Sequence, residues 1–548
     1  MTNQDNGVTN YAYDVLNRVT SLTNPQGQIT KYAYDPVGNI LTQTDSNSTV
    51  TTRTYSKDNQ VLTAKTTNSA SHVLASANYV YDTAGLKTSI TQDNGNVINY
   101  TYDAVHHLAG EVKNTASNTL VYSYAYTYDP LGNRLTMNTN LNGVALTYNY
   151  TYNNLNELTQ SVPVASNGTQ GAVTAYSYNN DGDLVKKVSA GQATAYAYDF
   201  DNRLTKITYP NATTSAFVYS ADDRRLKTTE GVTVTNYLYD GQLPVIERNA
   251  LNVTQNTYTN GLGYPGGIGG LISQAQGTTT SWYHYVHNGD GSVSSLSNAQ
   301  GNLAEMYDYE GFGNIAAQSG TVTTNTRKFQ TKELNTSSGL IYFGRRWYDP
   351  TVGRWTTADP LGMVDGPNEY LYVDGDPVNL EDSYGLYSSM DLLRDSSNFS
   401  AGFGDFITFG GTNWIRNKMG TNNVVNKCSG FYAAGEIAGG VAGLALGGEA
   451  DAAEVADGTI EAEQTTESAS SKTIWDPNGP QVQIGVDPNS PTIIPMQDMR
   501  SIDQSSLDYV NEWGDTTVTV NGKGEVQEGH ARLQNARNTG RNVDVYRQ

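Results

Sequence analysis

The sequence predicts a mainly β protein of stacked hairpins, followed by a small α/β domain at the C-terminal end. Three observations predict this. Gly (54 residues) and Tyr (39 residues) are far above ordinary usage while charged residues make up only 16%, a mix that suits strands and turns better than helices. A tyrosine-rich phrase recurs through most of the chain, and the last part loses that phrase. With 548 residues, the chain is expected to form two or more structural units.

The repeated phrase is centred on a tyrosine followed by Asp or a substitute. These tyrosines are Tyr13, Tyr34, Tyr55, Tyr81, Tyr102, Tyr128, Tyr152, Tyr178, Tyr198, Tyr219 and Tyr239, at spacings of 20 to 26 residues. Clear copies read YAYDVLNRVTSLT, YAYDPVGNILTQT, YTYDPLGNRLTMN and YAYDFDNRLTKIT. Tyr-x-Tyr alternation places both rings on one face of a strand, and the following Asp with Gly or Asn favours a tight turn. Each copy is therefore expected to be a hairpin that buries its face only by stacking on its neighbours.

These residues resemble the YD-repeat family, called Rhs in bacteria, with teneurins as animal relatives. The resemblance covers roughly residues 8 to 386. It implies that the hairpins wind as a long spiral sheet into a hollow shell that encloses the C-terminal part of the chain. We therefore assign residues 1–325 to a YD-repeat β-shell. A plain β-solenoid without enclosed cargo is the alternative interpretation.

The repeats end in a different phrase, over residues 326–386. The stretch GLIYFGRRWYDPTVGRW resembles the Rhs core-associated segment, which seals one end of the shell, and DPVNLEDSYGL resembles the family's junction. Chains of the family cut themselves after the final Leu of that junction by an aspartyl-protease-like reaction. The resemblance therefore implies self-cleavage between Leu386 and Tyr387, without a cofactor.

Asp359, in DPLG, and Asp382, in EDSYGL, are the candidate catalytic residues. They lie 23 positions apart, so the fold could bring them together. Two carboxylates that share one proton can serve as base and acid toward a water molecule, because their repulsion separates their pKa values. Arg354, in GRW, could hold one carboxylate or the scissile carbonyl by charge-assisted hydrogen bonds.

Two features of the junction leave alternatives open. Ser383 follows the junction Asp where the family commonly has Pro. From spacing alone, Asp359 and Asp382 could simply form turns, because Asp-Pro and Asp-x-x-Gly are ordinary turn signals. Several other acids could also be mistaken for the pair: Asp365, Asp374, Asp376 and Glu381.

Residues 387–471 resemble the pre-toxin segment of Rhs chains, followed by an acidic linker. The apolar run Ile437–Gly448 has 12 residues, fewer than the roughly 20 that cross a bilayer. Its small residues suit a closely packed helix, with a membrane-active segment as the alternative. Residues 449–471 contain seven acids and no Lys or Arg, which is typical of a linker.

Residues 472–548 are expected to form the toxin domain. Strand signals in TVTVN, EVQEG and NVDVYR surround a helix signal in HARLQNARNTG. A strand that runs through Gly into a helix N-terminus can bind phosphate, because free N–H groups point outward there. The order resembles the ParB/sulfiredoxin-like fold, whose members bind nucleotide phosphates in that turn and include nucleotide hydrolases and DNA-cutting enzymes.

That resemblance implies roles for residues of the turn. Gly529 would let the backbone approach phosphate, while His530 and Arg532 would bind or polarise it. Glu528 would orient water or a divalent metal, and His530 would be a general base. Alternatively, His530 and Arg532 only occupy an exposed helix start.

Charge and cysteine content exclude several classes. The net charge of −21 makes the whole chain repel nucleic acid and anionic membranes, so a nucleic-acid activity would need a local patch. The single cysteine, Cys428, excludes an intrachain disulfide framework, and the six histidines show no zinc-type spacing. No signal peptide is seen, because the N-terminus lacks a basic region followed by an apolar run.

The resemblance to the Rhs family implies a secreted antibacterial toxin, made in the bacterial cytoplasm and delivered to a target cell. The expected partners are its own cleaved C-terminal fragment inside the shell, a cognate immunity protein and components of a secretion apparatus, often type VI. The expected toxin target is a nucleotide or nucleic acid. The alternative function is a cell-surface YD-repeat adhesion protein without toxic activity.

Overall fold

The computed structural model describes residues 7–261, 267–277, 281–322, 324–363 and 366–386, and the backbone of short strands farther along the chain. The chain divides into two compact units, Met1–Gly448 and Glu449–Gln548. The predicted limit between residues 325 and 326 lies inside the first unit, because the two parts on either side of it pack together. The mainly β class is confirmed, since strands dominate the described residues and the helices among them are short 3-10 turns.

The described repeats form one 28-stranded sheet, in which each strand pairs antiparallel with the next along the chain. The first half contains β1 (Asn10–Tyr13), β2 (Val19–Thr23), β3 (Ile29–Tyr34), β4 (Ile40–Thr44), β5 (Val50–Tyr55), β6 (Val61–Thr67), β7 (Val73–Tyr81), β8 (Lys87–Gln92), β9 (Val97–Tyr102), β10 (Leu108–Asn114), β11 (Leu120–Tyr128), β12 (Arg134–Leu141), β13 (Val144–Tyr152) and β14 (Leu158–Ala165). The second half contains β15 (Thr174–Tyr178), β16 (Leu184–Ser189), β17 (Gln192–Tyr198), β18 (Leu204–Thr208), β19 (Thr214–Tyr219), β20 (Arg225–Glu230), β21 (Thr233–Asp240), β22 (Leu243–Arg248), β23 (Thr254–Asn260), β24 (Leu271–Gln276), β25 (Ser281–His287), β26 (Val293–Asn298), β27 (Leu303–Tyr309) and β28 (Ile315–Gly320). The predicted hairpin repeat is therefore present.

In most of the Tyr-Asp turns, the Asp side chain closes the turn. In the first copy, one carboxylate oxygen of Asp14 accepts the backbone N–H groups of Leu16 and Arg18, both at 2.9 Å. Asn17 takes the positive φ of 61° that the turn requires, which Asn tolerates better than most residues. The ladder register also shifts at Tyr13, between Ala12 and Tyr13, so the strand bends where it enters the turn.

The tyrosine before each Asp ties its hairpin to the preceding one. The hydroxyl of Tyr34 donates to the carbonyl of Val19 at 2.7 Å, and that of Tyr128 donates to the carbonyl of Leu108 at 2.7 Å. The same bond to an earlier carbonyl is made by Tyr55, Tyr81, Tyr102, Tyr152, Tyr198, Tyr219, Tyr239 and Tyr309. This row of bonds, which we call the tyrosine ladder, explains why the repeat uses Tyr where Phe would bury as much ring.

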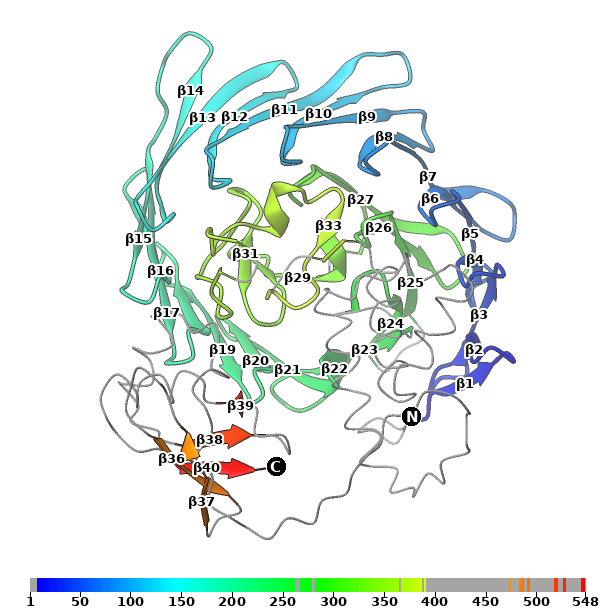
Figure 1. The fold of residues 1–548 in the computed structure, drawn as a ribbon. Helices are drawn as coiled ribbons and strands as arrows, with labels where there is room; N and C mark the ends of the chain where they lie inside the picture. The colour runs from blue at the N-terminus through cyan, green and yellow to red at the C-terminus, as the bar shows by residue number, and fades with distance from the viewer. Residues whose placement is uncertain are drawn as a thin grey trace. The chain divides into compact units, whose positions relative to one another are not determined.

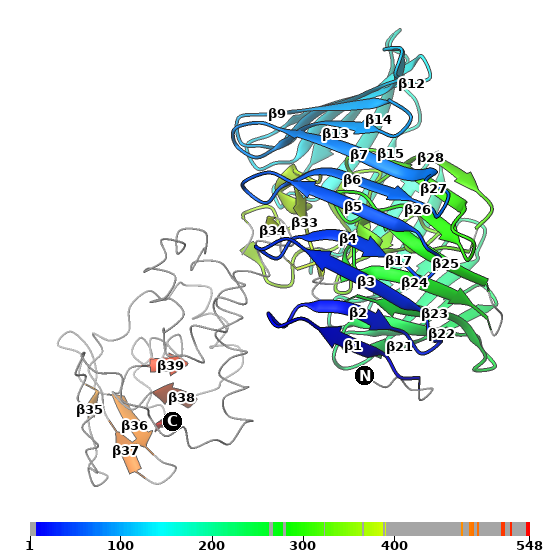
Figure 2. The same ribbon diagram turned by 90° about the vertical axis from the view of Figure 1, so that its right-hand side faces the viewer.

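The sheet of the first unit coils on itself. Figure 1 shows β1 to β22 curving round until β23 to β27 lie beside the early strands, and Figure 2 shows the same neighbours from the side. Polar side chains bridge this seam. Asn24 donates to Thr259 Oγ1 at 3.1 Å, and Asn47 donates to Ser297 Oγ at 2.9 Å. The pairs are 235 and 250 residues apart, so the predicted spiral is present.

The core-associated segment, residues 326–386, fills the inside of the curve (Figure 1). Its elements are η2 (Phe329–Thr331), β29 (Glu333–Leu334), β30 (Ile341–Tyr342), β31 (Trp347–Asp349), β32 (Arg354–Trp355), η4 (Val373–Gly375) and β33 (Leu380–Glu381), and β33 pairs with β34 (Ser389–Met390). Its buried rings, among them Phe343, Tyr348 and Trp355, form one apolar core with Tyr285 and Tyr307 of the repeats. The repeats therefore bury their inner face against this segment.

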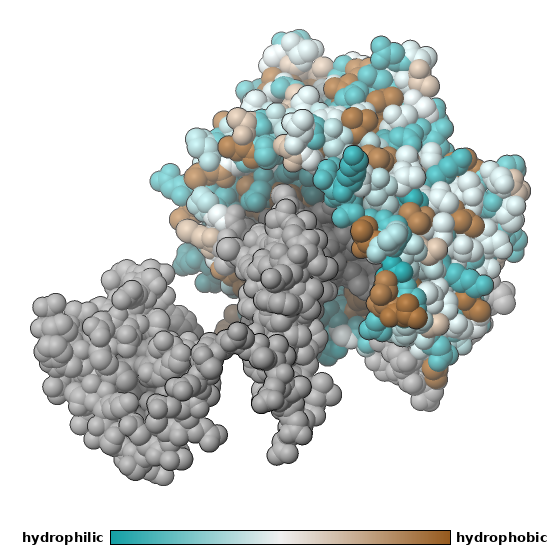
Figure 3. Space-filling view, turned by 45° about the vertical axis from the view of Figure 1, so that its right-hand side comes forward, coloured by the Kyte–Doolittle hydropathy of each residue, from teal (hydrophilic) through white to brown (hydrophobic). Residues whose placement is uncertain are grey.

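The outer face of the sheet is mixed in character. Figure 3 shows apolar residues scattered among polar ones on the visible face. Thr side chains pair across exposed strands, as Thr127 and Thr136 do at 2.7 Å, which stabilises a sheet modestly. Within the described residues, no helix has the length and apolar character of a membrane span.

The second unit contains two small sheets in its described strands. One contains β35 (Thr473–Ile474), β36 (Val482–Val486) and β37 (Ser490–Thr492). The other has the order β39 (Val526–Glu528), β38 (Thr517–Val520), β40 (Asp544–Arg547), with β38 parallel to β40 and antiparallel to β39. The three strands predicted here are present, whereas the predicted helix lies outside the described residues.

Candidate self-cleavage site

The two predicted carboxylates meet at one arginine. Arg346 follows the turn between β30 and β31, and one of its terminal nitrogens lies 2.6 Å from Asp359 Oδ2 and 3.5 Å from Asp382 Oδ2. Both distances are measured from the same nitrogen. The separation of the two carboxylate oxygens therefore cannot exceed the sum of these two distances. All three side chains are nearly inaccessible to solvent. The fold therefore brings Asp359 and Asp382 together, and a guanidinium lies against both.

Each carboxylate divides its two oxygens between a turn and the arginine. Asp359 Oδ1 accepts the N–H of Leu361 at 2.8 Å. Asp382 Oδ1 accepts the N–H groups of Tyr384, Gly385 and Leu386 at 3.1, 2.7 and 3.0 Å. Both residues thus form turns, as the alternative interpretation expected, while the second oxygen of each stays directed at Arg346. We call residues Asp382–Leu386 the junction turn.

Arg346 also binds the junction turn directly. Its Nε donates to the carbonyl of Gly385 at 2.5 Å, and a terminal nitrogen donates to the carbonyl of Glu369 at 3.2 Å. The guanidinium lies 4.2 Å from the ring centroid of Trp355, a cation–π contact. Arg346 is not among the residues predicted from the sequence. The Arg-Arg pair in GRRW could have indicated it, because arginine commonly binds carboxylates.

Arg354, the arginine predicted to serve this site, lies elsewhere. Its guanidinium donates to Asn133 Oδ1 at 2.8 Å and to the carbonyl of Asn156 at 2.5 Å, so it fastens the core-associated segment to the repeats. The reason is strand alternation in β32, where successive side chains point to opposite faces. Trp355 faces Arg346, and Arg354 therefore faces the shell.

A small cavity adjoins the carboxylate pair. Its volume is about 10 Å³, which is near the minimum volume that holds one water molecule. Its lining includes Asp359, Asp382, Arg346 and Trp355. Asp374, one of the acids that the sequence left as an alternative, also lines it. Asp374 takes a positive φ of 50° within η4.

Burial dominates the electrostatics of the junction turn. It raises the pKa of Asp382 above its ordinary value, although Arg346 and the three N–H groups oppose that rise. At the start of the turn, the ammonium of Lys332 donates to the carbonyl of Ser383 at 2.6 Å. Burial lowers the pKa of Lys332 to about 8, and the charges of Asp382 and Glu381 oppose that fall.

The remaining predicted residues are not at this pair. Asp376 accepts two bonds from Asn379 Nδ2, at 2.8 and 3.0 Å, and burial raises its pKa to about 6. Asp365 and Tyr387 lie outside the described residues, as do Gly529, His530 and Arg532, and of Glu528 only the backbone is described. Within the described residues, no group of three or more His, Cys, Asp or Glu side chains is placed to hold a metal ion.

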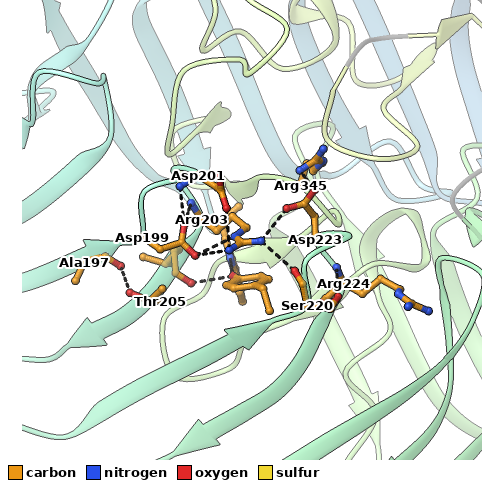
Figure 4. Close-up of polar contacts among 12 residues, drawn as sticks. Ala197, Asp199, Asp201, Arg203, Thr205, Ser220, Asp223, Arg224 and Arg345 are labelled. Atoms are coloured by element: carbon orange, nitrogen blue, oxygen red, sulfur yellow. Dashed lines mark hydrogen bonds and ion pairs between the residues drawn. The ribbon is translucent and has the colours of Figure 1, made fainter. Parts of the chain in front are cut away.

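Ion pairs connect this segment to the Tyr-Asp turns. Figure 4 shows Arg203, which binds Asp199 of its own turn at 2.9 Å and Asp223 of the next turn at 2.9 Å. The other oxygen of Asp223 faces Arg345, the neighbour of Arg346. One repeat motif is thus in contact with the segment that carries the candidate site.

Comparison with known proteins fits this architecture. Residues 1–132 match the teneurin YD-shell family model, and residues 178–214 match the RHS repeat model. Over these ranges the chain is similar to teneurin YD-shell and RHS repeat sequences. Among curated proteins, the chain is 28% identical over 261 residues to a tRNA3(Ser)-specific nuclease, WapA, of Bacillus spizizenii, and 39% identical over 114 residues to toxin subunit YenC2 of Yersinia entomophaga.

These alignments cover parts of each protein. They include 45% and 21% of this chain, but only 10% and 11% of the two relatives. In the solved Tc holotoxin pore of Photorhabdus luminescens, one chain is 19% identical with a TM-score of 0.48, over 69% of this chain and 21% of that one.

Proposed function

We propose that this chain is a toxin whose YD-repeat shell releases its C-terminal part by cutting its own backbone after Leu386. The observation that carries the proposal is the convergence of Asp359, Asp382 and Arg346 on the turn that ends at Leu386. The fold holds the Leu386 N–H on Asp382 Oδ1, so the residue with the scissile carbonyl is fixed beside a buried carboxyl group.

In the proposed reaction the two carboxyl groups have different tasks. Asp359, in close contact with Arg346, stays ionised and takes a proton from the attacking water. The water oxygen bonds to the carbonyl carbon of Leu386. Asp382, whose pKa is raised, donates a proton to the nitrogen of Tyr387 as the C–N bond breaks. The products are a new carboxylate at Leu386 and a new amino terminus at Tyr387, and no cofactor is needed.

This reaction is tested by replacing each carboxylate in the full chain. Purified wild-type protein should give two fragments on a denaturing gel, and mass spectrometry should place the break between Leu386 and Tyr387. Asp359→Asn and Asp382→Asn should each leave one full-length band, because each removes one of the two proton-transfer groups. Since shape alone can hold the cargo, native sizing can still show one particle.

The matched control is Asp376→Asn. Asp376 is a buried acid of the same segment that is bonded to Asn379 and not to Arg346, so this variant should still be cut. If both Asp359→Asn and Asp382→Asn were still cut after Leu386, the assignment of these two residues as the catalytic pair would be wrong.

For the released part, we propose phosphate binding at residues 472–548, with nucleotide or nucleic acid as target. One observation supports it: β39 ends at Glu528, the residue before Gly529, where the sequence predicts the strand to end. The WapA relative is named a tRNA nuclease, and RNA is therefore the first substrate to assay, with and without divalent metal. Secretion, a type VI apparatus and an immunity protein belong to the same proposal.

The competing function is a cell-surface adhesion protein. Expression of residues 387–548 alone in a bacterium separates the two. Growth arrest that His530→Ala relieves supports the toxin. Harmless accumulation of folded protein supports adhesion.

A further inference from the structure

Lys332 is a second buried cation that contacts the junction turn, at a different residue from Arg346. It directly follows η2, where Gln330 and Thr331 both take positive φ values. Its backbone is bonded in both directions, since its N–H donates to Phe329 and its carbonyl accepts the N–H of Lys328. The base of the side chain is therefore held in one place.

The ammonium of Lys332 reaches the junction turn itself. Its Nζ lies 2.6 Å from the carbonyl oxygen of Ser383. Ser383 immediately follows Asp382 and opens the turn whose N–H groups bind that carboxylate. The turn is thus hydrogen-bonded to Lys332 near its start, at Ser383, and to Arg346 near its end, at Gly385.

We propose that Lys332 is a positioning residue for self-cleavage, which holds the Ser383 carbonyl so that the Leu386 carbonyl stays in front of the carboxylate pair. This inference rests on the proposed self-cleavage. A charge-assisted hydrogen bond is stronger than a neutral one, and the loss of one by truncation slows a reaction that depends on it by roughly 10- to 100-fold.

Lys332 lines a cavity that is larger than the one beside the carboxylate pair. Its volume is about 90 Å³, and Lys332, Ser383 and Tyr384 all line it. The other charged or titratable groups that line it are Asp223, Arg224, Arg225, Tyr239, Tyr258, Arg327 and Tyr342. Asp382 and Glu381 act on Lys332 from the junction side.

The charge on Lys332 makes the inference testable by pH. The ammonium is present below its folded pKa of about 8 and is lost as the pH rises through that value. Cleavage by the wild type should therefore slow above about pH 8. Lys332→Arg keeps a cation at every pH in that range, and the cavity leaves space for the longer side chain. This variant should lose the alkaline decline.

The experiment uses full-length chain made by cell-free translation. Translation is stopped, and the fraction cut is followed on denaturing gels in buffers from acid to alkaline pH. Lys332→Met should be cut roughly 10- to 100-fold more slowly than wild type. Lys328→Met is the matched control, because Lys328 is also buried but its ammonium contacts Gln318; its rate should stay near that of the wild type.

The outcomes separate this inference from the proposed function. If the wild type is never cut, both fall together. If the wild type is cut but Lys332→Met is cut equally fast, or if Lys332→Arg shows the same alkaline decline as wild type, only the role of Lys332 is overturned. Slow cutting in Lys328→Met as well would mean that any buried charge in this segment matters, which also overturns it.

Discussion

Asp359 and Asp382, 23 residues apart in the sequence, direct one oxygen each at a single nitrogen of the same guanidinium. In a simple pair of acids, the two carboxyl groups share only a proton, whereas here they also share the guanidinium of Arg346. The cation lowers the cost of holding a charged carboxylate in a buried place, and the second oxygen of each acid stays fixed in a backbone turn. Small changes around the pair should therefore have large effects.

Arg346→Lys should nearly abolish self-cleavage. Lysine keeps the positive charge but cannot reach both carboxylates and the Gly385 carbonyl with one planar fork. We expect a rate at least roughly 100-fold lower, since more than one charged hydrogen bond is lost. Timed denaturing gels measure it. The neighbouring Arg345→Gln is the control, because Arg345 is 42% exposed and pairs with Asp223; an equal loss in that variant would contradict the prediction.

Gly385→Ala should also block cleavage. Gly385 has a φ of +74°, and an added Cβ would lie 3.0 Å from the Arg346 backbone nitrogen and 3.2 Å from the Phe343 Cβ. Gly339→Ala is a close match, with a φ of +75° and no atom within 4 Å. Both variants carry the strain of positive φ, about 1–2 kcal/mol, but only Gly385→Ala moves the junction turn. Gel assays that show both variants cut normally would argue against a rigid turn.

The tyrosine ladder should contribute to stability. Tyr128→Phe removes the hydroxyl bond to the Leu108 carbonyl and leaves the ring in place. The expected cost is about 1 kcal/mol of unfolding free energy, measured as a lower midpoint in urea. Tyr13→Phe, on the half-exposed edge strand β1, should change the midpoint little. A larger loss there than at Tyr128 would count against the ladder.

The seam should be weakened through Glu111 as the pH rises from about 4.5 to about 8. Tyr122 and the Gly311 N–H bind its two oxygens, both at 2.7 Å. Burial, and then the charge of Glu310, raise its pKa from 4.5 to about 8. The folded state therefore holds a proton that the unfolded chain releases, so this stabilisation is full below about pH 4.5 and is lost as the pH rises to 8.

Glu111→Gln should remove most of that dependence. Each pH unit between the two pKa values costs the wild type about 1.4 kcal/mol, so the variant should gain stability relative to wild type from pH 5 to pH 8. Thermal midpoints of both proteins across that range provide the measurement. Parallel curves for the two proteins would show that Glu111 ionises normally in the fold.

Local patterns predicted much of the repeat from the sequence. Tyr-x-Tyr and Asp-x-x-Gly-Asn depend on backbone geometry within a few residues, so the hairpins and their turns were predictable. The ladder bond from Tyr128 to Leu108 was not, because it joins hairpins 20 residues apart and the pattern shows only that a ring is present.

At the site, the two carboxylates and the junction were predicted from the sequence, because the phrases around Asp359 and Asp382 resemble a family segment. The arginine that joins the two carboxylates could not be predicted in this way, because it depends on the tertiary structure. Arg346 and Arg354 both lie next to an aromatic residue in similar phrases. Arg354 does not contact the carboxylates, because the side chains of Arg354 and Trp355 point to opposite faces of β32. The hydrogen bond from Lys332 to Ser383 likewise joins residues that are 51 positions apart in the sequence. Such a contact forms only after the whole segment has packed inside the coiled sheet.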